Sequence, residues 1–424
     1  MKSFDCDLHF HGLYAGGVSK FMTIPVIAEQ AKLKGLSVVS TADITHAKWF
    51  EHVKENLVEE ENGVFSDKAG KTHFVVGTEV EDSKRVHHLI FLPDFSSAQT
   101  FREKVARFGV LDCVMCGRPK LRLSAETIAE IADGCGGIFG PAHSFTPYTG
   151  IYAHFDSLKQ AYGQMHEKLS FIELGLSADS YFADLIQENH GYAFLTASDS
   201  HSPWPYRIGR EFTRMKLKKP CFGEIKKALA SRDEGLIELN VGLDPREGKY
   251  HATACNACFA RFSAEDAKRF DWKCPKCRGQ IKKGVKDRIL ELASFSQEIH
   301  PEFRPEYFHA IPLAEIVQLA LGAKDVKAKE VQGLWLEMVE RLGPETGILV
   351  DEPIVSISEI NESVAKKVES FRNGWVHYIP GGGGNYGKPI ICDSREEFET
   401  KKLELERQEK GFGMKGQKTL KEFE

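Results

Sequence analysis

Asp7, His9 and His11 alternate near the start of the chain, in a segment whose residue types predict a β-strand over 7–11. Because strand side chains point alternately to opposite faces, these three side chains share one face. Two adjacent imidazoles at a strand end can bind a metal ion, and a carboxylate one step behind them can orient the rings. The alternative is a pair of ordinary histidines at the end of an edge strand.

Further side chains of metal-ligating types stand at the ends of other predicted strands. The strands are predicted at 37–41, 73–77, 88–92, 137–140 and 194–197. Singly, each of these side chains has an ordinary explanation, such as a helix cap or a hydrogen-bonded polar group. Jointly they predict a multinuclear metal centre, since catalytic groups gather at the C-terminal ends of strands in parallel barrels. The predicted ligands are His9, His11, Asp43, His46, Glu79, His88, His143, Asp199 and His201.

The predicted strands alternate with segments of helical periodicity, such as 23–34 and 124–133. Repeated strand–helix units predict a parallel barrel or an open α/β sheet in the first part of the chain. A cysteine-rich module, a mainly helical part with a glycine-rich loop, and a charged tail follow in that order. The predicted domains are therefore 1–245, 246–290, 291–393 and 394–424.

Composition narrows the class of protein. The chain has 424 residues, of which 42% are hydrophobic, enough for two or three domains with cores. No basic segment followed by an apolar run opens it, and no stretch approaches the roughly 18 apolar residues of a membrane span. We therefore expect a soluble, cytoplasmic protein with no membrane partner. The net charge of −5 provides no global attraction to nucleic acid.

Four of the ten cysteines form two Cys-x-x-Cys pairs, Cys255 with Cys258 and Cys274 with Cys277. Two such pairs fifteen residues apart predict a zinc ribbon, in which four thiolates bind one structural zinc ion. From 246 to 288, 12 Lys and Arg stand against 5 Asp and Glu, a local net charge of +7. This charge favours a grip on the nucleic-acid backbone over a plain solvated surface.

Cys113 and Cys116 have no partner pair, so a buried pair or a disulfide is expected there rather than a metal site. Residues 382–388 match Gly-x4-Gly-Lys, but Pro389 stands where a phosphate loop needs Ser or Thr, so we expect no ATP binding. The glycine-rich loop could instead approach DNA phosphates through its amides, or be a plain flexible loop.

The last residues have the spacing of a motif that docks repair proteins on the sliding clamp (PCNA). In this motif one helical turn brings the two apolar side chains together. The residues concerned are Gln417, Leu420 and Phe423.

Several of these segments, in this order, resemble the motifs of the PHP family (polymerase and histidinol phosphatase). One family motif, Thr-Asp-His, reads Ala42-Asp43-Ile44 here, with His46 further on, so Asp43 or His46 is expected in that place. The matching segments are Asp7–His11, Gly77–Glu79, His88, Ala142–His143 and Ser198–His201.

The PHP resemblance implies a distorted (β/α)7 barrel that holds up to three metal ions and hydrolyses phosphate esters. It implies that Glu79 bridges two metals and that Asp199, beside His201, holds the ion nearest the attacking hydroxide. Bound metals activate water for in-line displacement, so no serine or cysteine nucleophile is needed. Zinc is the expected catalytic metal, with magnesium or manganese as alternatives.

The order of barrel, basic ribbon, helical part and clamp-like tail resembles the archaeal endonuclease Q family. This resemblance implies a DNA repair endonuclease that acts on double- and single-stranded DNA containing deaminated bases (uracil, hypoxanthine, xanthine) or abasic sites. It would cut the phosphodiester 5′ of the lesion, leaving 3′-hydroxyl and 5′-phosphate ends.

Such an enzyme must flip a base out of the duplex, and aromatic side chains beside the metal ligands suit that task, although core packing explains them equally well. The predicted pocket residues are Phe145, Tyr148, Tyr152, Trp204 and Tyr206. The main alternative is a small-molecule phosphatase of the histidinol-phosphatase type, and a third is an inactive DNA-binding module.

Overall fold

The computed structural model describes residues 1–60, 63–70, 72–230 and 234–415. The clamp-like motif Gln417, Leu420 and Phe423 lies outside these residues. The chain divides into two compact units. Unit 1 consists of Met1–Pro312, Pro344–Thr346 and Pro380–Gly387, and unit 2 contains the intervening and following segments. The two units divide the chain differently from the four predicted domains, which stay a prediction.

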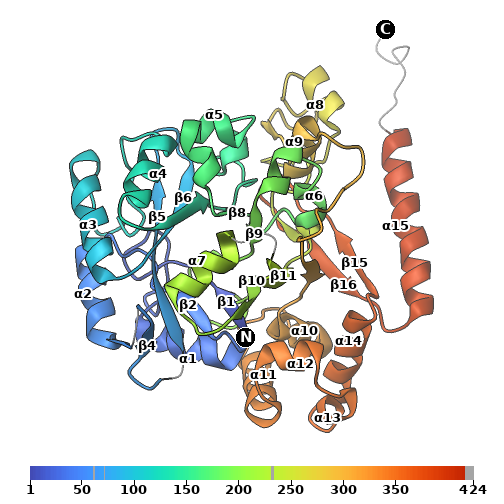
Figure 1. The fold of residues 1–424 in the computed structure, drawn as a ribbon. Helices are drawn as coiled ribbons and strands as arrows, with labels where there is room; N and C mark the ends of the chain where they lie inside the picture. Colours follow the sequence, from blue (N-terminus) through green and yellow to red (C-terminus); the bar gives the residue numbers. More distant parts are fainter. Residues whose placement is uncertain (61–62, 71, 231–233, 416–424) are drawn as a thin grey trace. The chain divides into compact units, whose positions relative to one another are not determined.

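Unit 1 is built on a mixed β-sheet (Figure 1). Strands β1, β2 and β5 are parallel neighbours, whereas β6 and β10 join them antiparallel. The order along the sheet is β14-β11-β10-β1-β2-β5-β4-β3, and β6 pairs with β5 and β7. The strands are β1 (Lys2–Asp7), β2 (Val38–Ser40), β3 (Leu57–Glu59), β4 (Phe65–Asp67), β5 (His73–Glu81), β6 (His87–Leu92), β7 (Ile138–Pro141), β10 (Phe212–Leu217), β11 (Ile237–Gly242) and β14 (Glu306–His309).

A separate parallel pair, β8 (Phe171–Glu173) and β9 (Ala193–Leu195), lies between the two ends of this arrangement. The Ser170 N–H donates to Phe139 O of β7 (3.1 Å), and the Thr196 N–H donates to Thr213 Oγ1 of β10 (2.9 Å). These links connect β7 to β8 and β9 to β10. The mixed α/β class is confirmed, and the (β/α)7 count stays a prediction.

The predicted strands overlap β2, β5, β6, β7 and β9, so they are confirmed. The first strand differs, since β1 ends at Asp7 rather than at residue 11. Beyond Asp7 the backbone leaves the sheet, and Phe10 forms an isolated bridge with Ser200. His9 and His11 therefore lie just past a strand end.

Helices surround the strands of unit 1, and Figure 1 shows α3 and α4 on the outer side of β5 and β6. The predicted helices 23–34 and 124–133 are confirmed, and Ser124 caps the second by accepting from the Thr127 N–H. The α-helices are α1 (Ile24–Lys34), α2 (Ala47–Asn56), α3 (Phe95–Val105), α4 (Ala125–Asp133), α5 (Leu158–Tyr162), α6 (Ser180–Ala183), α7 (Phe222–Ala230), α8 (Ala264–Arg269) and α9 (Val285–Leu292). Short 3-10 helices are η1 (Ala106–Phe108), η2 (Ile151–Ala153), η3 (Gly163–Lys168), η4 (Gln187–Gly191) and η6 (Pro245–Glu247).

The cysteine-rich segment forms a small module within unit 1. Its two short strands, β12 (Ala254–Cys255) and β13 (Ile281–Lys282), pair antiparallel. Its core joins Cys255, Cys274, Ala267 and Ile281, with three partly buried aromatic rings packed against them. Such a core is too small to support itself by apolar burial alone, so a metal ion would stabilise it.

Unit 2 is mainly helical, and its helix α11 contains the apolar residues Val331, Trp335 and Met338 on one buried face. Its elements are α10 (Leu313–Leu321), α11 (Lys329–Leu342), α12 (Glu345–Val350, which starts in a segment of unit 1), α13 (Ile354–Ser358), α14 (Glu362–Arg372), β15 (Val376–Ile379), β16 (Lys388–Ile391) and α15 (Arg395–Lys415). Within the described residues, no helix of either unit has the length and apolarity needed to cross a membrane.

Candidate metal centre

His9, His11 and Asp199 converge at one end of the sheet of unit 1. Both imidazoles are almost fully buried. Their Nε2 atoms lie 3.7 Å and 3.5 Å from Asp199 Oδ1, and all three ligand atoms lie within 4.8 Å of one another. This spacing allows a single cation to contact all three. His201 lies beside them, with its ring centroid 4.6 Å from that of His11.

A second group consists of Glu79, His87 and His143, all buried. Glu79 Oε1 lies 2.9 Å from His87 Nδ1 and 3.1 Å from His143 Nε2. The same carboxylate faces the first group, because its Oε2 lies 3.3 Å from His11 Nε2. Glu79 therefore stands between two possible cation positions, as expected of a bridging ligand.

Two buried carboxylates fix the orientation of the first two imidazoles. His9 Nδ1 donates to both carboxylate oxygens of Glu173 (2.9 and 3.0 Å), and His11 Nδ1 donates to Asp43 Oδ1 (3.1 Å). These bonds leave Nε2 of each ring as the free ligand atom, as in carboxylate–histidine–metal sites. Asp43 is thus placed to position His11, and Glu173 is a site residue that the sequence analysis did not include.

The structure brings His87, rather than His88, to Glu79. The two are adjacent on β6, so their side chains point to opposite faces. His88 lies on the other face, 2.6 Å from the Tyr162 hydroxyl and 3.3 Å from Asp82. The predicted ligand role of His88 is therefore replaced by one for His87.

His46 also lies apart from both groups. Its ring stacks on Tyr14 at 4.3 Å, and its Nε2–H donates to Cys113 O (3.1 Å). It caps α2 by accepting from the Trp49 N–H. Of the two alternatives for the second motif, Asp43 reaches the centre and His46 does not.

Asp7 supports the centre differently from the prediction that it orients the histidines. Its two carboxylate oxygens accept from the Ser198 and Gly209 N–H groups (3.0 and 2.9 Å), so it holds the segment that carries Asp199. Asp43, His143 and Asp199 all have positive φ angles of +36°, +28° and +45°. Strained backbone of this kind concentrates at functional sites.

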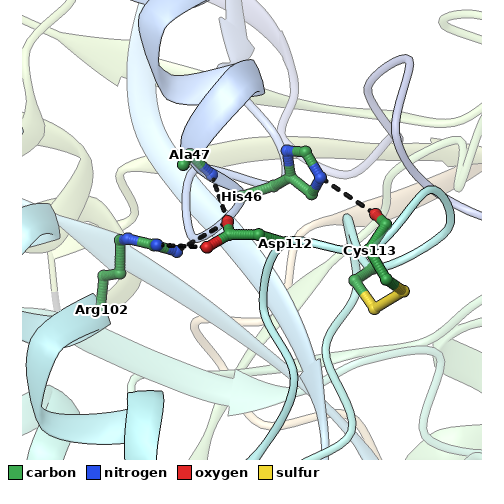
Figure 2. Close-up of a disulfide and its surroundings, with 6 residues drawn as sticks. His46, Ala47, Arg102, Asp112 and Cys113 are labelled. Carbon is green, nitrogen blue, oxygen red and sulfur yellow. Dashed lines mark hydrogen bonds and ion pairs between the residues drawn. A yellow bond between two sulfur atoms is a disulfide. The ribbon is translucent and has the colours of Figure 1, made fainter.

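The segment that precedes Arg118 carries a disulfide, Cys113–Cys116, one of the two predicted outcomes (Figure 2). Figure 2 shows the segment anchored at the start of α2: Cys113 O accepts from His46, and Asp112 accepts from the Ala47 N–H (2.8 Å). These bonds hold the segment at the start of α2, and the disulfide closes a short loop within the segment.

Arg118 enters the metal centre from this segment. Its Nη1 lies 3.1 Å from Glu79 Oε2, and its side chain remains 30% exposed. The preceding Gly117 packs on the centre so closely that a Cβ there would lie 2.8 Å from Asp43 Oδ2. Only glycine fits at that position. The segment therefore places one partly exposed guanidinium at the edge of a carboxylate-rich cluster.

The cluster attracts positive charge. Burial alone lowers the pKa of His9, but the carboxylates of Glu173 and Glu79 raise it well above its ordinary value. Burial raises the pKa of Asp199, yet His11 and His9 hold it well below its usual range. The carboxylates thus stay ionised and hold protons on the imidazoles when no other cation is bound, and a divalent cation can replace those protons.

Three buried ligand atoms of the first group fit a metal ion. Within the described residues, His9 Nε2, His11 Nε2 and Asp199 Oδ1 are buried without a hydrogen-bond partner. Buried polar atoms without partners are costly and uncommon in folded proteins. Mixed imidazole and carboxylate donors suit zinc and manganese, so the residues present fit the metals that the sequence predicted.

The four predicted zinc ligands of the ribbon also come together. The Sγ atoms of Cys255, Cys258, Cys274 and Cys277 lie within 4.8 Å of one another. All four thiols are free, so they can close a tetrahedron around one ion.

The predicted pocket aromatics divide into two sets. Phe145 and Tyr152 stack at 5.0 Å inside the core and are 4% and 1% exposed, so the pocket prediction fails for both. Tyr206 is 7% exposed and is largely buried as well. Tyr148 is 39% exposed, and Trp204 is half-buried against Phe21, so these two remain accessible to a ligand.

Comparison with known proteins identifies relatives over most of the chain. Residues 312–375 match the family model of the MJ0043 C-terminal domain. Protein MJ0043 of Methanocaldococcus jannaschii is 43% identical over 276 residues, which are 64% of this chain and 34% of that protein. The chain therefore spans about a third of the length of this relative.

Two solved structures resemble the chain over almost its whole length. One is the lesion-specific endonuclease PfuEndoQ of Pyrococcus furiosus, with 46% identity, a TM-score of 0.85, and coverage of 92% of this chain and 96% of that one. The other is endonuclease Q in complex with a 27-mer duplex substrate with an abasic lesion at the active site. It has 45% identity and a TM-score of 0.86, and the match covers 92% of this chain and 97% of that chain.

Proposed function

Because the chain belongs to the endonuclease Q family, we propose that it is a metal-dependent DNA repair endonuclease that cuts the phosphodiester bond 5′ of a damaged nucleotide. The proposed lesions are deaminated bases (uracil, hypoxanthine, xanthine) and abasic sites. The proposed products carry a 3′-hydroxyl and a 5′-phosphate. DNA, double- or single-stranded, is the proposed partner, and the sliding clamp (PCNA) is proposed to bind Gln417, Leu420 and Phe423.

One observation carries the catalytic part of this proposal: two groups of His and carboxylate side chains meet at Glu79, and the ligand atoms of the first group are buried without hydrogen-bond partners. His9, His11 and Asp199 would hold one metal ion, and Glu79, His87 and His143 would hold a second. Bound metals lower the pKa of a coordinated water and neutralise charge on the phosphate during in-line displacement. Zinc or manganese is proposed here, magnesium is an alternative, and zinc is proposed for the four thiolates of the ribbon.

The remaining residues prepare the centre for a phosphodiester. Glu173 and Asp43 hold the imidazoles in one orientation, so little reorganisation is needed when substrate binds. Arg118, His201 and Asp199 are the partly exposed members, with side chains 30%, 35% and 28% exposed. An incoming phosphate therefore meets these groups first, and the Arg118 guanidinium can donate to two phosphate oxygens.

The test is cleavage of an end-labelled duplex that contains one deoxyuridine, deoxyinosine or abasic site, with Mn²⁺ or Mg²⁺ added. We expect a nick immediately 5′ of the lesion, no nick in the lesion-free duplex, and extension of the product by a DNA polymerase, which requires a 3′-hydroxyl. Asp199→Ala should abolish the nick. Asp133→Ala removes a surface carboxylate paired with Lys168 and should not change it.

Two outcomes would contradict the proposal. If the DNA stays intact while a phosphate monoester is hydrolysed, a phosphatase of the histidinol-phosphatase type is favoured. If neither substrate is turned over with Mn²⁺ or Mg²⁺, the barrel is an inactive DNA-binding module.

A further inference from the structure

A continuous row of tyrosine rings and lysine ammonium groups lies on unit 1. Lys282 Nζ lies over the Tyr148 ring at 5.1 Å, and Tyr148 meets Tyr250 edge to face at 5.8 Å. Lys249 Nζ lies over both Tyr250 (5.3 Å) and Tyr386 (5.8 Å). We call these five residues the tyrosine–lysine row. Tyr148 and Tyr386 are 39% and 48% exposed, so the row is open to a ligand.

The glycine-rich segment, residues 381–387, positions Tyr386 in the tyrosine–lysine row. The amides of Gly381, Gly384 and Gly387 donate to backbone carbonyls of 246, 249 and 247 at 2.8–3.0 Å. Gly383 has φ +66°, and a Cβ there would lie 2.3 Å from Cys255 O. The segment is therefore hydrogen-bonded to residues 246–249, at the start of the ribbon. These three amides are not free to bind DNA phosphates, which was one of the two alternatives for this loop.

The part of the row that contains Tyr148 is connected to the metal centre. Tyr148 lies in the loop that starts at His143, and Thr149 O accepts from the His87 N–H (2.9 Å).

The two lysines of the row carry uncompensated charge. Within the residues that the structure describes, neither Lys249 nor Lys282 has a carboxylate partner within 4 Å. The adjacent Lys283 differs, since its Nζ lies 2.6 Å from Glu291. An ammonium that rests on an exposed ring is held weakly, and a phosphate would draw it away and free the ring face.

We propose that the tyrosine–lysine row binds unpaired nucleotides of the DNA strand held at the metal centre, with bases against the tyrosine rings and phosphates at Lys249 and Lys282. Stacking on aromatic rings suits bases of any sequence, whereas paired bases offer a protein only their edges and phosphates. The inference rests on the proposed function, because it assigns the row the strand that the endonuclease opens around a lesion.

The test is binding of a short, lesion-free, fluorescein-labelled oligothymidylate to the full chain, followed by anisotropy. Without a lesion the strand is not expected to be cut, so binding is measured alone. Tyr386→Ala should weaken binding about tenfold, and Tyr386→Phe should retain it. Lys282→Gln should weaken binding and reduce its log–log salt slope by about one, whereas Lys283→Gln should leave both unchanged.

A control variant and two other nucleic acids distinguish stacking on the row from simple phosphate contacts and from RNA binding. Tyr181→Ala removes a ring that is 42% exposed outside the row and should bind as the wild type does. Equal losses on a fully paired duplex would overturn the proposal in favour of simple phosphate contacts, and tighter binding of oligouridylate would assign the row to RNA. Wild-type-like binding by Tyr386→Ala would also overturn it. Failure of the endonuclease proposal appears separately, as absence of nicking by the wild-type chain.

Discussion

Glu173→Gln tests whether the buried carboxylate behind His9 controls metal binding. The change keeps the size of the side chain and removes its charge. In the structure His9 Nδ1 lies 2.9 and 3.0 Å from the two carboxylate oxygens, and Oε2 also accepts from the His143 N–H at 2.6 Å. A glutamine oxygen at the Oε2 position preserves both acceptor roles there. Its amide group then faces His9 Nδ1 as a second donor.

The expected effect is on metal affinity more than on structure. Removing the partner of a metal-bound histidine typically weakens metal binding roughly 10- to 100-fold, about 1.4–2.7 kcal/mol. Because one hydrogen bond to His9 survives in Glu173→Gln, we expect a loss near the lower limit, about tenfold. Glu173→Ala removes both acceptor oxygens and should approach the upper limit.

The assay is the Mn²⁺ dependence of nicking, with free Mn²⁺ measured by electron paramagnetic resonance. The Mn²⁺ concentration for half-maximal nicking should rise about tenfold in Glu173→Gln, while the rate at saturating Mn²⁺ stays close to that of the wild type. Glu188→Gln is the matched control, since Glu188 is a partly buried carboxylate bonded to Tyr152 rather than to a predicted ligand. A Mn²⁺ requirement unchanged in Glu173→Gln would refute the role of Glu173.

Further predictions concern stability, pH and the ribbon. Lys34 Nζ lies 2.5 Å from the buried Glu345 Oε1, so Lys34→Met should lower the free energy of unfolding in urea by about 3–5 kcal/mol. Adding Glu345→Leu to this variant should restore most of the loss. A loss below about 1 kcal/mol in Lys34→Met would contradict a stabilising ion pair. Burial raises the pKa of Glu211 to about 8, whereas the same group in the unfolded chain ionises near 4.5. The free energy of unfolding should therefore fall by roughly 1.4 kcal/mol per pH unit as the pH rises between these two values. Glu211→Gln should remove this part of the pH dependence of unfolding, and an identical slope in the variant would show that the group is not protonated in the fold. Cys274→Ser should release zinc, measured with a colorimetric chelator, and lower the melting temperature or the DNA affinity, with the barrel ligands still in place; unchanged values of both would argue against the zinc ribbon.

The sequence predicted those site residues whose local pattern is diagnostic. Short local segments were enough to predict the His-x-His pair, the paired Cys-x-x-Cys motifs and Glu79 after a predicted strand. His87 was missed because His87 and His88 are adjacent on one strand, and only the pairing of β6 decides which of them faces Glu79. A period of two predicts alternation but not the face that turns inward.

Glu173 was missed for a different reason. It lies 164 residues from His9 in sequence, at the end of a three-residue strand with no motif around it. Only the packing of β8 beside β7 brings it to the imidazole. The predicted pocket aromatics show that sequence position does not determine exposure. Phe145 and Tyr148 both follow His143, yet Phe145 packs in the core and Tyr148 is partly exposed to solvent.

The ribbon also differs from an independent DNA-binding module joined at residue 245. Arg288, in α9 at the end of the predicted ribbon segment, donates to Tyr152 O (2.8 Å) and to Phe155 O (3.1 Å), which lie in the first predicted domain. Lys282 of β13 lies over Tyr148, and β13 pairs with β12, which contains the thiol Cys255. The four thiols therefore set the position of a lysine that belongs to the tyrosine–lysine row. Loss of the ribbon metal should consequently displace Lys282 at the edge of the candidate metal centre, as well as destabilise the ribbon itself.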